Sequence, residues 1–378
     1  MDSQETIYLN HAGTSWPKPQ PVLAAAASVW QSDPTDWPTL FKSAHHTVAK
    51  FFHVDPQRLL LTPSCTAAIN LAVTDHAWNT GDRVVTSNFE HHALYRALVK
   101  LNEHGIDITT LPQGSNDLLQ LELLEAELKS GGVRLVALTA ACNVTGHLLP
   151  ISEAITLAHA FDAIVLVDGA QIAGWWDLDV PELGADLFTF AGHKGTQAPW
   201  GIGGLFVSPN VSMNCPEATC ERLELQAASH CTVMPGYCDA GSVNLSALAG
   251  LAAGCCWLNE PQQRSRLQHA RNLAGEFAEA VRNVPGVLVH HDVSVDKKVP
   301  TVASSVEGAS CTDIAARLRA SGLITSAGFQ CAPQAHRALG TDRNGVIRFS
   351  FGPTSDVSDV PRAAESLRMA CKNGEGVK

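Results

Sequence analysis

The stretch AIVLVDGAQIAGWWDLDVPELGADLFTFAGHK, residues 163–194, decides the fold. It opens with an almost purely apolar run that ends at Asp168. It closes with a second apolar run, Leu187–Ala191, which leads into His193 and Lys194. Short apolar runs separated by enough chain to cross over are typical of buried parallel strands in α/β proteins. In open α/β sheets ligands bind beyond the carboxyl ends of the strands, so Asp168 and Lys194 are candidate site residues.

The same alternation of apolar runs and helical patterns extends outward from this stretch, over residues 51–207. It predicts a mainly parallel seven-stranded sheet. The expected strands are Leu59–Thr62, Arg83–Ser87, Ile106–Leu111, Leu135–Thr139, Ala163–Val167, Leu187–Ala191 and Gly204–Val207. The expected helices between them are Thr66–Asp75, Ala93–His104, Leu121–Lys129 and Ile151–Ala160.

The pattern changes after this region. Two helical segments, Leu245–Leu258 and Arg266–Val281, are followed by a hairpin-like stretch, a helix at Thr312–Ser321 and a last strand at Gly345–Phe351. We therefore expect three parts: an N-terminal arm (1–20) packing on the small domain, a large domain (21–255), and a smaller C-terminal α+β domain (256–378).

Composition narrows the class of protein. Of the 378 residues, 45% are hydrophobic and 17% charged, and the formal net charge is −11, which disfavours nucleic-acid or anionic-membrane partners. No apolar run has spanning length, and the first residues lack the features of a signal peptide. Eleven cysteines in such a chain suggest reduced thiols. We expect a cytoplasmic enzyme with no membrane partner.

Lys194 and Asp168 together suggest a chemistry. Lys194 lies in an apolar, glycine-rich setting, where burial would lower the pKa of its amine, as a covalent-catalysis lysine requires. A carboxylate at the end of a buried strand needs a partner, and a protonated pyridine nitrogen is one. Each residue alone has an ordinary explanation, a turn cap for Asp168 and a solvated side chain for Lys194. Their combination favours pyridoxal phosphate (PLP).

Two further segments have a functional and an ordinary interpretation. Ser64-Cys65-Thr66 lies between a strand and a helix, where amides and the helix dipole suit a phosphate, but an N-cap explains Thr66 equally well. The segment Gly328-Phe-Gln-Cys-Ala-Pro is a loop signal that would expose Cys331 as a nucleophile. A buried structural cysteine is the alternative.

Motifs along most of the chain make it resemble a known family. The chain is similar to class V aminotransferase-fold enzymes, in the branch of cysteine desulfurases and selenocysteine lyases. The similarity implies PLP-dependent transferase fold type I. The matching motifs, in order, are YLNHAGTSWPKP (8–19), PSCTAAIN (63–70), NFEHHAL (88–94), NVTGHLLP (143–150), VDGAQIAG (167–174), AGHKG (191–195), GIGGLFV (201–207), DAGSVN (239–244), GFQCAP (328–333) and VIRFSFG (346–352).

The resemblance implies a role for each matching residue. Lys194 would bind PLP covalently, Asp168 would pair with the pyridine nitrogen, and Gln171 would hydrogen-bond the phenolic oxygen. His91 would stack on the ring, and Thr66, the backbone at Cys65 and His193 would hold the phosphate. The resemblance also implies a homodimer whose site lies at the interface, with Ser242 reaching the phosphate of the other subunit. Asn143 would lie beside ring and substrate, Arg348 would bind the substrate carboxylate, and Cys331 would take sulfur as a persulfide for an acceptor protein.

Three departures affect the expected function. Ala191 replaces a Ser or Thr that donates to the phosphate, a hydrogen bond worth about 1.5–3 kcal/mol. Ser326 replaces a second arginine near the substrate carboxylate, and the loop before the Lys42–His53 helix is shortened to residues 32–38.

These departures leave two alternatives to a cysteine desulfurase. One is another PLP reaction on a small amino acid: selenocysteine lyase, β-elimination, racemisation or transamination. The other is a degenerate, non-catalytic subunit. We expect no metal, since Cys215, Cys220, Cys231, Cys238 and His230 lack tight ligand spacing.

Overall fold

The structure is a computed structural model that describes residues 6–74, 78–114, 118–176, 178–211, 213 and 243–372. The chain forms two compact units. We call the first the C-terminal unit; it comprises Met1–Pro17, Ala141–Leu148 and Glu260–Lys378. The second, the sheet unit, comprises Lys18–Ala140 and Leu149–Asn259. The short segment Ala141–Leu148 therefore lies with the C-terminal unit, although the chain on both sides of it belongs to the sheet unit.

The sheet unit contains the predicted seven-stranded sheet. Its strand order is β2-β8-β7-β6-β5-β3-β4, with bounds β2 Leu59–Thr62, β3 Arg83–Ser87, β4 Asp107–Leu111, β5 Val133–Thr139, β6 Ile164–Asp168, β7 Leu187–Ala191 and β8 Gly203–Val207. Only β8 pairs antiparallel with its neighbours, and the other pairs are parallel. The prediction of a mainly parallel α/β sheet is confirmed.

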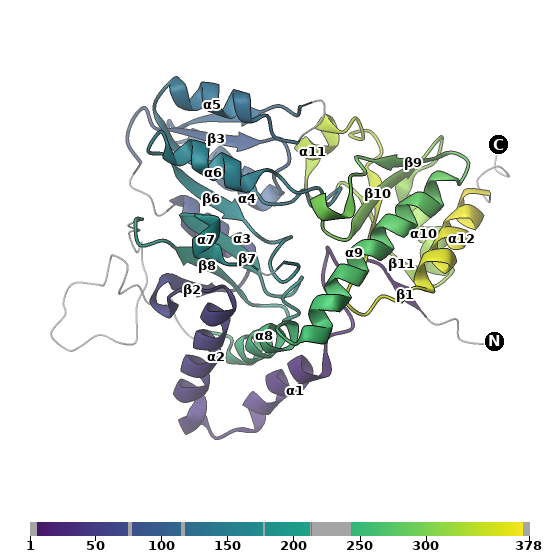
Figure 1. Cartoon of the computed structure of the whole chain (residues 1–378), viewed down its shortest axis with the longest axis horizontal. Coiled ribbons are helices and arrows are strands. Elements are labelled where there is room, and N and C mark those ends of the chain that lie inside the picture. Colours follow the sequence, from purple (N-terminus) through teal and green to yellow (C-terminus); the bar gives the residue numbers. More distant parts are fainter. Residues whose placement is uncertain are drawn as a thin grey trace. The chain divides into compact units, whose positions relative to one another are not determined.

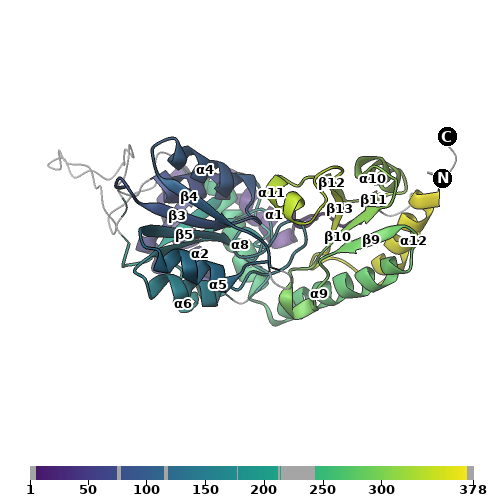
Figure 2. The same ribbon diagram turned by 90° about the horizontal axis from the view of Figure 1, so that it is seen from above.

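Helices cover both faces of this sheet. Figure 2 shows β3, β4 and β5 between α4 on one side and α5 and α6 on the other. The helices of the unit are α1 Gln20–Ser28, α2 Trp37–Phe51, α3 Cys65–Thr74, α4 His92–Asn102, α5 Leu121–Lys129, α6 Ile151–His159, α7 Val180–Leu183 and α8 Leu245–Leu258. Because both faces are covered, the central strands are mostly apolar, and β7 is buried along its whole length.

The register of the sheet brings three polar residues together. Thr139 at the end of β5 pairs with Asp168 at the end of β6, and Asp168 pairs with Thr189 on β7. The carboxyl ends of these parallel strands therefore form one polar edge above an apolar core.

The C-terminal unit is built on a four-stranded antiparallel sheet in the order β12-β13-β10-β9. Its strands are β9 Val287–His290, β10 Thr301–Val306, β12 Ser326–Gly328 and β13 Val346–Ser350. Two short strands, β1 Ile7–Tyr8 and β11 Leu323–Ile324, pair in parallel. The helices are α9 Pro261–Arg282, α10 Cys311–Ala320, α11 Pro333–Ala338 and α12 Asp359–Lys372. Figure 1 shows α9 running beside β9 and β10, where Phe277 packs on Phe349.

Some details differ from the sequence predictions. Helix α9 begins at Pro261 instead of Arg266, because a proline suits the first position of a helix. His45, in the predicted Lys42–His53 helix, is half-buried, and its Nε2 lies 2.9 Å from the Leu59 carbonyl. Within the described residues, no helix is both long and apolar enough to cross a membrane.

Candidate active site

Asp168 ends β6 as a buried carboxylate, with 3% of its surface exposed. Its Oδ1 accepts hydrogen bonds from the Ala170 amide at 3.0 Å and from the Cys65 thiol at 3.5 Å. Both of these hydrogen bonds fall on the same carboxylate oxygen. A buried carboxylate is stabilised by a cationic N–H donor, such as a protonated pyridine nitrogen.

The start of α3 lies beside this carboxylate. Burial first, and then the charge of Asp168, raise the pKa of the Cys65 thiol well above its usual value, so Cys65 stays protonated. Ser64 caps the helix through its Oγ, which accepts from the Ala67 amide at 3.2 Å. The cap is therefore Ser64 and not Thr66, whose side chain is exposed.

Gly203 on β8 lets this helix start approach the sheet. A Cβ at Gly203 would lie 2.8 Å from the Cys65 amide nitrogen, too close for any other residue. The first amides of α3 thus lie against the strand beside β7, an arrangement that suits a phosphate.

Lys194 follows β7 in a turn and is partly buried. The positive charge of Lys194 lowers the pKa values of both Cys65 and His193, so its amine lies near the cluster that contains Cys65 and Asp168. Burial, followed by the charges of Lys194 and Lys18, lowers the pKa of His193 to about 4, which keeps its ring neutral at pH 7. Lys18 donates to the His193 carbonyl at 3.0 Å.

His91 is the N-cap of α4, and its Nδ1 accepts from the Ala93 amide at 3.1 Å. That contact assigns the remaining ring proton to Nε2 in the neutral ring. The residue before it, Glu90, is 1% exposed and accepts from the Ser87 hydroxyl and the Thr139 amide. His91 is thereby fixed at the polar edge of the sheet.

The remaining predicted cofactor and metal residues are either buried near the strand ends or lie outside the described part of the chain. Gln171 is buried in the turn after β6, and Ala191 is buried at the end of β7, where it offers no hydroxyl. Ser242 and the group Cys215, Cys220, Cys231, Cys238 and His230 lie outside the described residues. Within the described part of the chain, no three His, Cys, Asp or Glu side chains are arranged to hold a metal ion.

Arg348 forms the centre of a second polar group, in the C-terminal unit. It lies on β13 with 4% of its surface exposed. Its guanidinium donates to the Asn143 carbonyl at 2.7 Å and to Asn10 Oδ1 at 3.3 Å, both neutral acceptors. Arg348 Nε and Asn143 Oδ1 are buried without a hydrogen-bond partner among the described residues. Burial lowers the pKa of Arg348 to about 10, but the group stays charged at pH 7.

A buried guanidinium with only neutral partners needs an anion. The planar fork of arginine suits a carboxylate in particular. The arrangement of Arg348, Asn10 and Asn143 in this unit suits a carboxylate.

Cys331 lies in the same unit and is exposed. A negative charge on Cys331 would raise the pKa of Arg348, because the thiol lies near the guanidinium. The structure thus favours the exposed interpretation of Cys331 over the buried one.

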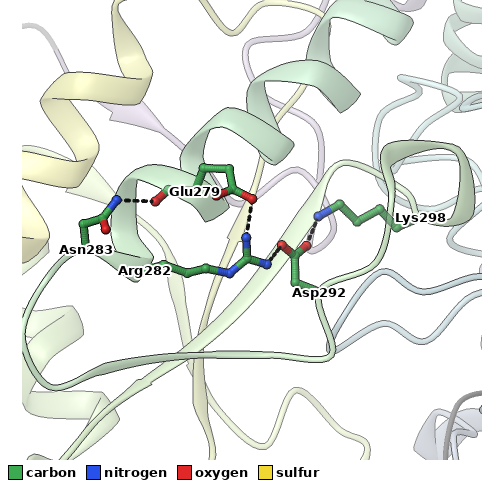
Figure 3. A network of polar contacts seen from close by, with 5 residues as sticks. All are labelled: Glu279, Arg282, Asn283, Asp292 and Lys298. Carbon is green, nitrogen blue, oxygen red and sulfur yellow. Dashed lines mark hydrogen bonds and ion pairs between the residues drawn. The ribbon is translucent and has the colours of Figure 1, made fainter.

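An ion-pair network with a buried lysine at one end holds the segment that pairs with the Asn143 loop. Arg282 on α9 bridges Glu279 and Asp292, and Asp292 also binds the ammonium of Lys298, which is 2% exposed (Figure 3). The chain next to Lys298 is hydrogen-bonded to the loop, through Val299 N to Gly146 O at 2.9 Å. Asn143 is therefore positioned by the C-terminal unit.

Sequence reasoning missed Asn10, Lys18 and Glu90 as members of these groups. Asn10 and Lys18 lie inside the motif at residues 8–19, and Glu90 directly precedes His91. Lysine between two prolines and a carboxylate at a strand end are the signals that could have indicated Lys18 and Glu90.

The family of the chain follows from comparison with known proteins. The family model described as "Aminotransferase class-V" matches residues 7–362. The chain belongs to this family. A probable cysteine desulfurase of Pseudomonas aeruginosa is 30% identical, covering 94% of this chain and 91% of that protein. The cysteine desulfurase CsdA of Escherichia coli is 29% identical, covering 96% and 94%.

Solved structures support the fold of this family member. A crystal structure of Escherichia coli CsdA matches with a TM-score of 0.87 and 25% identity, covering 97% of this chain and 95% of that one. The apo cysteine desulfurase of Thermococcus onnurineus has the same TM-score and coverage at 24% identity, which is evidence for the fold alone.

Proposed function

We propose that this protein is a PLP-dependent cysteine desulfurase that converts L-cysteine to L-alanine and takes the sulfur as a persulfide on Cys331. The observation that carries the proposal is the pairing, in one unit, of an exposed thiol with a buried guanidinium that has no anionic partner among the residues the structure describes. The names of the similar proteins support the same reaction.

The sheet unit fits PLP. Asp168 has a buried oxygen that suits the pyridine N–H, the amides at the start of α3 suit the phosphate, and Lys194 provides the amine. His91 and Gln171 would face the ring and its phenolic oxygen, and His193 would contact the phosphate. When bound, PLP withdraws electrons from the substrate Cα.

The residues of the chain then divide the remaining work. Arg348 and Asn143 hold the carboxylate of cysteine, and Lys194 removes the Cα proton and returns a proton to the product. The Cys331 thiolate forms an S–S bond with the substrate sulfur while the Cβ–S bond breaks. The electron pair of that bond stays on carbon and takes a proton, which gives alanine and a Cys331 persulfide.

The same proposal includes partners. We propose a homodimer in which Ser242 reaches the partner's phosphate, and an acceptor protein that receives the sulfur in the cytosol. The relatives named as cysteine desulfurases support this through similarity over nearly their whole length.

Alanine and sulfide release from L-cysteine in the presence of a reductant tests the function. We expect activity in the wild type, none in Cys331→Ala, and wild-type activity in Cys256→Ala, which removes another exposed thiol on α8. PLP absorbance should be equal in all three. Unchanged alanine formation by Cys331→Ala would contradict persulfide chemistry.

Ser326 favours a second candidate, another PLP reaction on a small amino acid. Ser326 is the register partner of Arg348, so the residues that would bind the substrate carboxylate include one cation where the resemblance led us to expect two. Normal PLP absorbance without cysteine turnover, together with turnover of an amino acid lacking sulfur, would support this candidate over the first.

A further inference from the structure

The turn that presents Cys331 has a strained backbone. Gln330 has φ +40° and Cys331 has φ +56°, two successive non-glycine residues in the left-handed region. Such conformations persist only where the surroundings hold them, and they concentrate at functional sites. The turn itself closes with one hydrogen bond, from the Ala332 amide to the Phe329 carbonyl at 2.8 Å.

Gln330 is the anchored residue of this turn. Its carbonyl accepts from Asn143 Nδ2 at 2.7 Å, and its side-chain Nε2 donates to the Val346 carbonyl at 3.2 Å. The remaining side-chain atom, Oε1, lies 3.2 Å from His336 Nε2. All three contacts are made within the C-terminal unit.

His336 completes this set of contacts from α11. It is fully buried, its Nδ1 lies 2.7 Å from Thr341 Oγ1, and its ring meets Phe329 edge-on at 5.4 Å. Because Gln330 Oε1 can only accept, the contacts assign the ring proton to Nε2, and Thr341 then donates to Nδ1. Burial chiefly lowers the pKa of His336 to about 4, which keeps this neutral form at pH 7.

We propose that His336 is a positioning residue for Cys331: its Nε2–H holds Gln330, and through Gln330 it keeps the left-handed turn that presents the thiol. The consequence for catalysis rests on the proposed desulfurase function, whereas the effect on the turn does not. A side chain at position 336 that lacks a donor at this point would release Gln330 and let the turn relax.

Three substitutions separate the donor from the bulk of the ring. His336→Gln keeps an amide N–H near the position of Nε2, His336→Asn reaches only the position of Nδ1, and His336→Leu removes both. His269→Leu, an exposed histidine on α9, is the control. Each variant is studied as the PLP-loaded full chain, with PLP absorbance measured to verify loading.

Two measurements are made on each variant. Amide hydrogen exchange at Ala332 should be at least about fivefold faster in the Leu and Asn variants, the size expected for one lost hydrogen bond, and unchanged in the Gln and control variants. With L-cysteine, kcat should fall at least about fivefold in the same two variants while KM, which depends on Arg348, stays within about twofold.

The outcomes are distinct. Wild-type exchange in both His336→Leu and His336→Asn overturns the proposal, as does wild-type kcat despite faster exchange. If His336→Leu fails to fold, the comparison of Gln with Asn decides alone. Absence of cysteine turnover in the wild type refutes the desulfurase function and the catalytic consequence, while the exchange data still decide whether His336 holds the turn.

Discussion

Glu90 gives the most quantitative prediction about the sheet unit. It is 1% exposed, and burial first, opposed by the Ser87 hydrogen bond and reinforced by the charge of Asp168, raises its pKa from 4.5 to about 8. The folded protein therefore holds a proton on Glu90 over a range in which the unfolded chain releases it. Stability from this group is fully present below pH 4.5 and is lost as the pH rises toward about 8.

Glu90→Gln removes this titration and keeps the geometry of the neutral acid. The amide oxygen can accept from Thr139, and the amide nitrogen can donate to Ser87. At about 1.36 kcal/mol for each pH unit, the proton on Glu90 accounts for a loss of about 3.5 kcal/mol in unfolding free energy between pH 5 and pH 8. The unfolding free energy of Glu90→Gln relative to that of the wild type should therefore rise by about 3.5 kcal/mol between pH 5 and pH 8.

Urea unfolding at pH 5, 6, 7 and 8, followed by tryptophan fluorescence with PLP present, measures the difference between the two proteins. Glu103→Gln, at the exposed end of α4, is the control for changing a carboxylate to an amide. A difference between Glu90→Gln and wild type that stays constant within about 1 kcal/mol across the series would refute the reasoning.

Two further substitutions test the C-terminal unit. Arg348→Lys should raise KM for L-cysteine about 10- to 100-fold in steady-state assays, because a point charge cannot replace the bidentate fork; an unchanged KM would remove Arg348 from substrate binding. Asp292→Ala should lower the unfolding free energy by about 3–5 kcal/mol in urea titrations, because it leaves Lys298 buried without its carboxylate; a loss under about 1 kcal/mol would contradict the importance of this pair.

Local sequence patterns predicted the sheet unit well. The expected strands begin and end within two residues of the observed ones, because short apolar runs bounded by turn residues and separated by helical patterns are typical of strands in an α/β sheet. The same runs indicated where Asp168 and Lys194 stand, since Asp168 ends one apolar strand and Lys194 comes three residues after the end of the next.

Contacts between distant parts of the chain could not be predicted in this way. Nothing in the eight residues 141–148 indicates that they pair with the chain near Val299 and not with the strands that flank them. The link from His336 to Gln330 is a second example, because it depends on a short helix, α11, that has no amphipathic pattern long enough to read.

Ser326 shows how structure changes the meaning of a sequence observation. In the sequence it is a missing arginine, which leaves open whether the charge is replaced from elsewhere. In the sheet Ser326 lies directly opposite Arg348, so the two side chains share one face of the sheet and the position across from Arg348 carries no charge. The groups that accept hydrogen bonds from Arg348, the Asn10 side chain and the Asn143 backbone carbonyl, are neutral as well. One cation among neutral neighbours matches a substrate with one carboxylate, and a second acidic group would find no partner among the residues that bind Arg348.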